Sequence, residues 1–433
     1  MTRIMIAGAG HAGLGVATGL VNSGADVDVD LFTVHTTEEL LRAPRLTQMT
    51  FPTVYELEKQ AGLDFWSGAS PVFRDISFSV AAGVGPVQSF TGQQRGLGTG
   101  IDHGAKTAAW LQKVEQDDQS NPRGARIRVQ TVQEPGLRWF ATSGMYDLVI
   151  VATGDSDPHL ATLFPQVSTP STSRVVVQAH FEGAPPGPDV QVFTTPVGEI
   201  FCYPVLAAYW EPLARGQAEG PPPELFAGTA VQVYARAGGP MDPTSVIDPT
   251  TGQSAITYSA RPEMRLAAWQ HAHASLATYA PELAHWCADA SLVDQSLLMR
   301  TVTPKVRQPV THIDGIPVLG IGDAVLTVDP TSGQGANAST RVAATVTNKI
   351  LQRLDDGGKL ADTEFLTDAY QAYWTEHGQY TSLFSQLVTD FWSGTLPPHM
   401  GERFGRNFSD QAQADRMVVG WDDPSTLGWL LNP

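Results

Sequence analysis

The sequence predicts an α/β fold in which a dinucleotide-binding domain carries an inserted antiparallel sheet and is followed by C-terminal helices. Three segments predict this class. Residues 3–7 form an apolar strand that runs into the glycine-rich segment 8–13 (GAGHAG), a helix and a second strand at 27–32, the order of a dinucleotide-binding unit. Residues 146–154 (YDLVIVATG) are apolar enough for a central strand buried on both faces. Residues 320–339 repeat the pattern of strand, glycine-rich turn and helix start.

The remaining segments are assigned from their periodicity and from their glycine and proline breaks. Helices are expected in most of 38–66, with interruptions at Pro44 and Pro52, at 105–116, at 265–288 and in two or three segments after residue 340. Strands are expected at 70–100, 125–132 and 137–142, and a second, antiparallel sheet over 174–260 with a surface loop at 216–223. The tail 393–433 is expected to be irregular.

The composition restricts the class of partner. The 433 residues carry 27 Lys and Arg against 44 Asp and Glu, and a net charge of −17 argues against nucleic acid, whose binders concentrate cations. Cys202 and Cys287 are too few for a disulfide framework and are expected to be buried. We find no signal peptide and no apolar run of the ~18 residues that a membrane helix needs, so we expect a soluble, cytoplasmic protein without a membrane partner.

The segment 8–13 predicts a diphosphate site. Gly8 would make the tight turn, Gly10 would let the backbone approach the phosphates, and Gly13 would let the helix pack on the strand. The N-terminus of this helix, at His11 and Ala12, would point its backbone N–H groups at the phosphates.

The second strand ends without the acid that usually binds a ribose in such sites. Asp30 lies inside the apolar run, and Thr33 stands nearer to its end. A hydroxyl at that place makes a weaker hydrogen bond than a carboxylate, which disfavours a tight NAD site.

The segment 320–339 predicts a second contact with a longer dinucleotide, FAD. Gly322-Asp323 ends a strand, and a carboxylate there can accept hydrogen bonds from ribityl hydroxyls that the first loop cannot reach. A helix that starts at 333–337 (GQGAN) can point backbone N–H groups at the flavin pyrimidine or the ribityl phosphate, and its glycines permit close approach.

Together these segments resemble the glutathione-reductase-type flavoproteins and, more narrowly, the styrene and indole monooxygenases, which are FAD-dependent epoxidases of two-component systems. The resemblance covers nearly the whole chain in order and spacing. The matching residues are 8–14 (GAGHAGL), 146–154, Gly198-Glu199-Ile200 with Pro204, and 320–339.

The resemblance implies that a separate NAD(P)H-dependent flavin reductase supplies reduced FAD. The reduced FAD would react with O2 to form a C4a-hydroperoxide. This species would transfer one oxygen to an alkene or indole-like aromatic substrate and give an epoxide. Delegated reduction agrees with the lack of a second glycine-rich loop for a nicotinamide, and with Ala152-Thr153-Gly154 where self-reducing aromatic hydroxylases have an Asp-Gly pair. The oligomeric state stays open, with a homodimer as one option.

The resemblance also implies a division of the chain into three parts. A discontinuous FAD-binding domain of the glutathione-reductase type would comprise 1–48, 101–172 and 300–352. A substrate-binding domain would comprise 49–100 and 173–299, and a C-terminal helical region 353–433.

The expected site lacks acid–base chemistry, because the flavin is the reagent and the protein must orient the substrate and exclude water. Pro330 would give a rigid backbone beside the flavin ring, Asn337 would hydrogen-bond its pyrimidine edge, and Thr303 completes the group expected around the reaction. The cofactor-binding set is Gly8, Gly10, His11, Ala12, Gly13, Thr33, Arg42, Arg45, Ala152, Thr153, Gly154, Gly322, Asp323, Pro330, Gly333, Gly335, Ala336 and Asn337. The substrate-pocket set, for a small apolar or aromatic molecule, is Gln48, Thr50, Phe73, Phe78, Phe193, Phe201, Tyr203, Val302 and Pro304. No metal site is expected.

The chain departs from the family at two places. Family members carry an Arg that helps to hold FAD where this chain has Asp102-His103-Gly104, and Arg42, Arg45 or Lys106 are the candidates to replace it. Styrene-type members carry an Asn and a His where this chain has Gln48 and Pro52, so substrate identity does not transfer.

The histidines are expected to be ordinary. His11, His103 and His285 are each assigned to hydrogen-bonded or solvated positions without a catalytic task.

Other functions stay open at this point. The chain could oxygenate a sulfide or an amine, could act as a flavoprotein dehydrogenase or cyclase without O2 chemistry, or could merely carry flavin. Product formation with reduced FAD and O2 distinguishes these classes.

Overall fold

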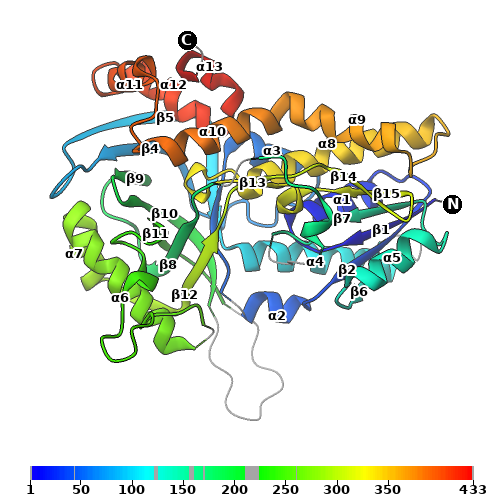
Figure 1. Ribbon diagram of the computed structural model, residues 1–433, viewed down its shortest axis with the longest axis horizontal. Helices are drawn as coiled ribbons and strands as arrows, with labels where there is room; N and C mark the ends of the chain where they lie inside the picture. The colour runs from blue at the N-terminus through cyan, green and yellow to red at the C-terminus, as the bar shows by residue number, and fades with distance from the viewer. Residues whose placement is uncertain are drawn as a thin grey trace.

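The protein builds two sheets that lie side by side, with helices on both faces of each (Figure 1). A computed structural model describes residues 2–42, 44–120, 125–155, 160–168, 171–209, 224–259 and 261–431. No helix within these described ranges is both long enough and apolar enough to cross a membrane.

The first sheet has the order β14-β15-β7-β1-β2-β6 and is parallel except for β14, which runs against β15. Its strands are β1 (Thr2–Ala7), β2 (Val27–Thr33), β6 (Ala125–Val129), β7 (Leu148–Val151), β14 (Val310–Ile313) and β15 (Ile316–Gly320). Side chains alternate between its faces, since Ile4 and Ile6 join the cluster under α1 (His11–Asn22), α4 (His103–Ser120) and α8 (Gly335–Asp355). Met5 and Ala7 join the opposite cluster, under α5 (Glu134–Thr142).

The second sheet has the order β12-β8-β11-β10-β9-β4-β5-β3 and is antiparallel except between β4 and β9 and at a parallel pairing of β10 with β5. Its strands are β3 (Gln48–Thr50), β4 (Val72–Val80), β5 (Gln88–Ile101), β8 (Arg174–Glu182), β9 (Val190–Thr195), β10 (Gly198–Tyr209), β11 (Glu224–Arg236) and β12 (Leu292–Val302). The predicted inserted antiparallel sheet is therefore present, and the chain has an α/β fold.

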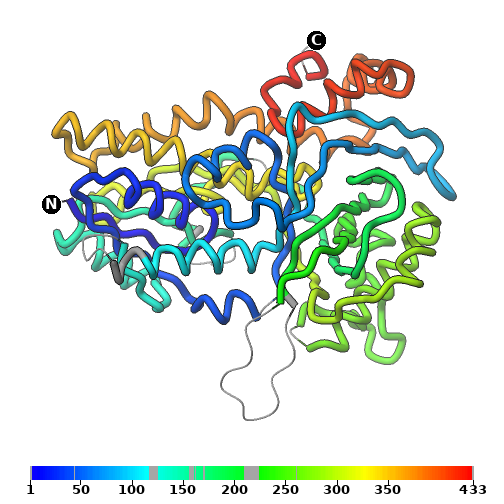
Figure 2. The backbone as a smooth tube through the Cα atoms, turned by 180° about the vertical axis from the view of Figure 1, so that it is seen from behind, coloured from blue at the N-terminus to red at the C-terminus, as the bar shows by residue number. Residues whose placement is uncertain are grey.

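The two faces of the second sheet pack against different helices. Cys202 of β10 joins a cluster with α6 (Pro262–Tyr279) and α7 (Pro281–Asp289), whereas its neighbours Phe201 and Tyr203 face the C-terminal helices. Those helices are α10 (Gln379–Asp390), α11 (Pro398–Gly405), α12 (Gln411–Asp422) and α13 (Gly428–Leu431). Figure 2 shows them over the β4–β5 hairpin. Both cysteines are buried free thiols.

Short elements connect these layers. They are α2 (Thr37–Arg42), α3 (Pro52–Gln60), the pair β13 (Lys305–Val306) and β16 (Leu326–Thr327), and α9 (Thr363–Tyr373). The segment 38–66, expected to be mostly helical, thus holds two short helices around strand β3.

Three expectations about secondary structure are wrong. Residues 137–142 belong to helix α5 and not to a strand, because Pro135 sits in the first turn and Leu137 and Ala141, four residues apart, share the buried face. The helix expected at 265–288 is two helices, since Pro281 begins a new one. The tail 393–433 is helical in its described part. The loop expected at 216–223 lies outside the described residues.

Candidate active site

Three glycine-containing turns, far apart in the sequence, line one cavity of about 480 Å³, here called the glycine-loop cavity. Strands β1, β7 and β15 are parallel neighbours, so the turns at 8–10, 152–154 and 322–323 meet at the same edge of the first sheet. The predicted residues that line this cavity are Gly8, Gly10, His11, Ala12, Thr33, Arg45, Gln48, Ala152, Thr153, Gly154, Gly322, Asp323, Gly335 and Ala336.

A second cavity of about 260 Å³, the Pro330 cavity, adjoins the first. Arg45, Gln48, His103, Asp155, Arg300, Asp323 and Gly335 line both cavities. The other predicted residues on its wall are Phe201, Tyr203, Val302, Pro330 and Gly333. The glycine turns and the turn at Pro330 therefore belong to one continuous site.

The glycines of the first loop have different tasks in the structure. Gly8 has a φ of 110°, and a Cβ there would lie 2.3 Å from the Ala152 carbonyl oxygen. A Cβ on Gly13 would lie 1.9 Å from the Gly8 carbonyl oxygen, so Gly13 packs helix α1 on the turn and does not line the cavity. A Cβ on Gly10 would meet no atom within 4 Å, and no side chain caps α1. The N-terminal N–H groups of α1 are thus left free for a ligand at the cavity wall.

Buried polar atoms without partners gather around the glycine-loop cavity. No described residue hydrogen-bonds either ring nitrogen of His11, Nδ1 of His103, Nε of Arg45 or Oγ1 of Thr153. Because buried polar groups are normally paired, such a group of atoms fits a ligand rich in oxygen and nitrogen atoms, as FAD is. The residues present therefore satisfy the needs of the expected cofactor.

Two of the histidines lie together at the glycine-loop cavity. The His11 and His103 rings are in contact, with centroids 4.3 Å apart and their planes tilted by 40°. Burial and His103 hold the pKa of His11 well below its usual value, and burial together with Arg45 lowers the pKa of His103 to about 3. Both rings are therefore neutral. His11 is buried with neither nitrogen hydrogen-bonded to a described residue, which contradicts the position expected for it, whereas His103 is half-buried with only Nδ1 unpartnered. His285 is exposed beside Asp289.

Charged groups of both signs face the junction of the two cavities. Burial raises the pKa of Asp323 to about 6, against the opposing effect of Arg300. Arg300, on β12, was not predicted from the sequence, and its charge adds to burial in lowering the pKa of Arg45. Arg45 and Arg300 line both cavities, and the pKa of Arg45 stays below its usual value although the Asp102 carboxyl acts in the opposite direction. An anion bound between these walls would therefore stabilise the guanidinium groups.

Arg45 is the candidate that lines the cavities in place of the family's FAD-contacting Arg. Lys106 is excluded, because its buried ammonium donates to Glu58 (2.7 Å) and to Thr50 (2.8 Å). Arg42 lies on α2, paired with Glu38. Gly104 is needed for packing, because a Cβ there would lie 2.7 Å from the Leu40 carbonyl oxygen.

Asn337 holds the start of α8 in place. Its Oδ1 accepts the Phe51 N–H (3.0 Å), and its Nδ2 donates to the Met49 and Gly333 carbonyl oxygens (2.8 Å each). Both amide hydrogens are therefore used inside the protein. The expected hydrogen bond from Asn337 to the flavin ring is corrected accordingly: the side chain keeps only accepting capacity at Oδ1.

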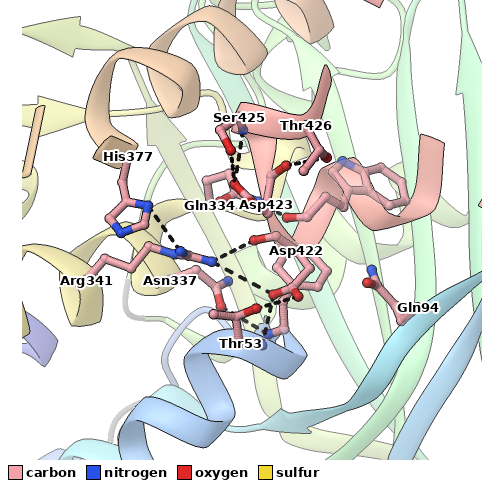
Figure 3. Close-up of polar contacts among 12 residues, drawn as sticks. Thr53, Gln94, Gln334, Asn337, Arg341, His377, Asp422, Asp423, Ser425 and Thr426 are labelled. Atoms are coloured by element: carbon pink, nitrogen blue, oxygen red, sulfur yellow. Dashed lines mark hydrogen bonds and ion pairs between the residues drawn. The ribbon is translucent and has the colours of Figure 1, made fainter. Parts of the chain in front are cut away.

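The C-terminal helices secure the same turn, as Figure 3 shows. Gln334 donates to the Trp421 carbonyl oxygen (2.6 Å), and Arg341 donates to the Asp422 carbonyl oxygen (2.7 Å). The Asp422 carboxylate accepts from the N–H and the hydroxyl of Thr53 (3.0 and 2.6 Å). The end of α12 is thus tied to the residues at and after the start of α8 and to the first turn of α3.

A third cavity of about 230 Å³, the aromatic cavity, lies between the second sheet and the C-terminal helices. Of the predicted substrate residues, Phe78 and Phe201 line it, and Phe201 also lines the Pro330 cavity.

The other predicted substrate residues lie elsewhere. Phe193 faces α6 and α7, Phe73 and Pro304 are buried outside these three cavities, and Thr50 is bound to Lys106. Thr303 hydrogen-bonds Ser173 (2.7 Å) and lines none of the three cavities, so its expected place at the reaction is wrong.

Comparisons with known proteins bear on the sequence and the fold as a whole. No family model matches the chain. It is 25% identical over 357 residues to the styrene monooxygenase StyA of Pseudomonas fluorescens, covering 81% of this chain and 77% of the relative, and to the same extent to the StyA of a Pseudomonas species.

Solved structures of low identity show the same fold. A flavoprotein/dehydrogenase from Cytophaga hutchinsonii aligns with a TM-score of 0.61 and 14% identity over 99% of this chain and 94% of its own. PqsL of Pseudomonas aeruginosa, described as a probable FAD-dependent monooxygenase, aligns with a TM-score of 0.56 and 14% identity over the whole of both chains. The chain is therefore similar in sequence to the StyA styrene monooxygenases, and its fold is similar to that of PqsL and of the flavoprotein/dehydrogenase.

Proposed function

We propose that the protein is the FAD-dependent oxygenase of a two-component system. It would take reduced FAD from a separate NAD(P)H-dependent flavin reductase, use O2, and transfer one oxygen atom to an alkene or indole-like aromatic molecule, forming an epoxide. The observation that carries this proposal is the convergence of the two glycine-rich loops, from opposite ends of the sequence, on two adjoining cavities rimmed by unpartnered polar atoms. The similarity to StyA supports it.

The residues of this chain divide the binding of the cofactor among them. Gly10 and the free N–H groups of α1 would hold the diphosphate, with Arg45 adding positive charge. Asp323, which lines both cavities, would accept hydrogen bonds from the ribityl hydroxyls. Pro330 and Gly333 would bound the ring in the Pro330 cavity. In this arrangement the first sheet and its helices form a discontinuous FAD-binding domain of the glutathione-reductase type.

The chemistry that bound reduced FAD supplies is the activation of O2. The two histidines at the cavity walls, His11 and His103, are neutral, and the charged groups there, Arg45, Arg300 and Asp323, would hold the cofactor. Its contribution is to position the reactants and to exclude water, which is what an oxygen transfer from flavin requires.

The direct test supplies chemically reduced FAD and O2 to the purified protein, together with styrene, indole or thioanisole. We expect a product that has gained one oxygen atom from at least one of them, and no need for NAD(P)H. A reaction without acceptor, in which peroxide is measured, is the control for uncoupled oxidation. Flavin binding without any oxygenated product would favour a carrier or a dehydrogenase, and the lack of both would refute the proposal.

A further inference from the structure

Arg307 connects two of the turns that line the glycine-loop cavity. It directly follows β13, and its guanidinium donates to the Asp155 carboxylate (2.8 Å) and to the Ala324 carbonyl oxygen (3.3 Å). Its backbone N–H donates to the Val325 carbonyl oxygen (2.8 Å). Asp155 follows β7 and Ala324 follows β15, so a single side chain spans the carboxyl ends of these two neighbouring strands.

The position of Arg307 differs from that of the acids it serves. Arg307 is only 7% exposed and lines none of the three cavities. Asp155 and Asp323 each line both the glycine-loop cavity and the Pro330 cavity. Arg307 can therefore influence a ligand in these cavities only through the groups that it holds in place.

The two acids would repel one another without a cation beside them. Burial raises the pKa of Asp323, and the negative charge of Asp155 raises it further, whereas the positive charges of Arg300 and Arg307 lower it. Lys305 also pairs with Asp155, at 3.1 Å from each carboxylate oxygen, but its side chain is 25% exposed. Arg307 is thus the buried cation that acts on both acids, and burial reduces the screening of its charge by water.

The turn that carries Asp323 is held at its backbone as well. The Thr327 hydroxyl donates to the Asp323 carbonyl oxygen (3.0 Å), and Arg307 holds the next carbonyl, that of Ala324. A guanidinium is planar and presents its donors in a rigid fork. Its simultaneous bonds to a carboxylate and a carbonyl therefore fix the position of one turn relative to the other.

We propose that Arg307 is a positioning residue for the part of the site that takes a ribityl chain, where it sets Asp155 and Asp323 as two acceptors for hydroxyl groups. This assignment rests on the function proposed above, because the ribityl chain belongs to FAD. The diphosphate would be held by other groups, Gly10 and the N–H groups of α1. Loss of Arg307 should therefore weaken the two halves of the cofactor unequally.

The test offers the two halves of the cofactor separately to the full chain. Riboflavin carries the ribityl chain without a diphosphate, and ADP carries the diphosphate without a ribityl chain. In Arg307→Met the Kd for riboflavin should rise at least about tenfold, the factor that one hydrogen bond to a charged group is worth. The Kd for ADP should stay unchanged. Flavin fluorescence measures the first and titration calorimetry the second.

The matched control is Arg126→Met. Arg126 also pairs with a buried carboxylate of the first sheet, that of Asp30 (3.0 Å), but lines none of the three cavities. Its replacement should leave both affinities unchanged. Because the loss of a buried cation can prevent folding, Arg307→Lys is the second variant, with circular dichroism reporting the fold. Its ammonium can still pair with Asp155 but cannot also fix the Ala324 carbonyl, so its Kd for riboflavin should lie between those of the wild type and Arg307→Met.

The two proposals fail in different ways. Unchanged riboflavin affinity in folded Arg307→Met and Arg307→Lys proteins, or an equal loss of riboflavin and ADP affinity, would overturn the positioning role. Riboflavin and ADP affinities as described, without any oxygenated product from reduced FAD and O2, would leave the role of Arg307 standing and overturn the oxygenase function. A wild type that binds no flavin would overturn both.

Discussion

The buried cluster of Arg174, Glu199 and Asp329 allows a sharp test of how charge is arranged beside the site. All three side chains are at most 6% exposed, and the one guanidinium lies 2.8 Å from Glu199 and 2.9 Å from Asp329. Asp329 also accepts from the Thr331 N–H and hydroxyl and from the Thr389 hydroxyl. The two carboxyls therefore share the Arg174 guanidinium, with Arg236 as a second nearby positive charge, and the hydroxyl and N–H donors of the cluster bind Asp329.

Two matched substitutions should change the free energy of unfolding by different amounts. Burial and the neighbouring Asp329 raise the pKa of Glu199 to about 8, so at pH 7 the neutral form exceeds the charged form about tenfold. Glu199→Gln then replaces one neutral group by another and should change the free energy of unfolding at pH 7 by no more than about 1 kcal/mol. Asp329→Asn removes the charge that balances buried Arg174 and should cost about 3–5 kcal/mol.

The sign of the change in stability with pH follows from the raised pKa of Glu199. The carboxyl of Glu199 has a pKa of about 8 in the folded protein, against a usual value of 4.5, so the folded state retains a proton that the unfolded state loses between these pH values. This group therefore lowers the stability of the wild type as the pH rises from about 4.5 to about 8, and adds no further slope above that. Glu199→Gln should remove this slope.

The assay is urea unfolding followed by circular dichroism at pH 5, 6, 7 and 8, for the wild type and both variants. The urea concentration at the midpoint of unfolding should fall from pH 5 to pH 8 in the wild type, and this fall should be smaller in Glu199→Gln. If Glu199→Gln costs as much as Asp329→Asn at pH 7, and the wild-type slope persists in it, then Glu199 is a charged partner of Arg174 and the reasoning is refuted.

Further predictions concern the cofactor and the acceptor. Gly13→Ala should destabilise the fold by about 1–3 kcal/mol or more in thermal unfolding, because its Cβ would overlap the Gly8 carbonyl oxygen. Gly10→Ala should leave stability within about 0.5 kcal/mol but raise the Kd for reduced FAD at least tenfold in anaerobic titration, since its Cβ meets no protein atom and would enter the diphosphate site. Arg300→Met should raise the same Kd about tenfold at low salt, and the difference from wild type should shrink at 0.5 M salt; an unchanged Kd would remove Arg300 from the site. Phe201→Ala should join the aromatic and Pro330 cavities, so that product analysis shows larger acceptors oxygenated and more peroxide released without product.

The backbone requirements of the glycine turns made the cofactor loops predictable from sequence. Only glycine tolerates the φ of Gly8 without strain, and only a residue without a Cβ fits at position 13. Such constraints are local, so a short segment can reveal them. Arg300 could not be found in this way, because it lies on β12 of the second sheet and reaches the glycine-loop cavity only through the packing of the two sheets.

The C-terminal helices carried a signal that the sequence reading missed. Ala414, Met417, Val418 and Trp421 recur at helical spacing along α12, and the carboxylate of Asp410 caps its first turn. The short apolar segment at 137–142 was harder, because a run of six residues fits either period and only Pro135 favoured a helix. The contact between His11 and His103 could not be predicted from the sequence, because the two rings meet only when α1 and α4 pack together.

The turn from Asp329 to Gly333 lies where the Pro330 cavity, the aromatic cavity and the buried cluster around Arg174 meet. Pro330 lines the Pro330 cavity, Thr331 lines the aromatic cavity, and Asp329 ties both residues to Arg174 and to α10. A site in which the flavin is the reagent gains its rate from the relative placement of the reactants, for which a misplacement of about 1 Å can cost a hundredfold. A folded Asp329→Asn protein should therefore lose kcat for oxygen transfer more than affinity for indole, because the turn positions both reactants while the walls that bind the acceptor stay in place.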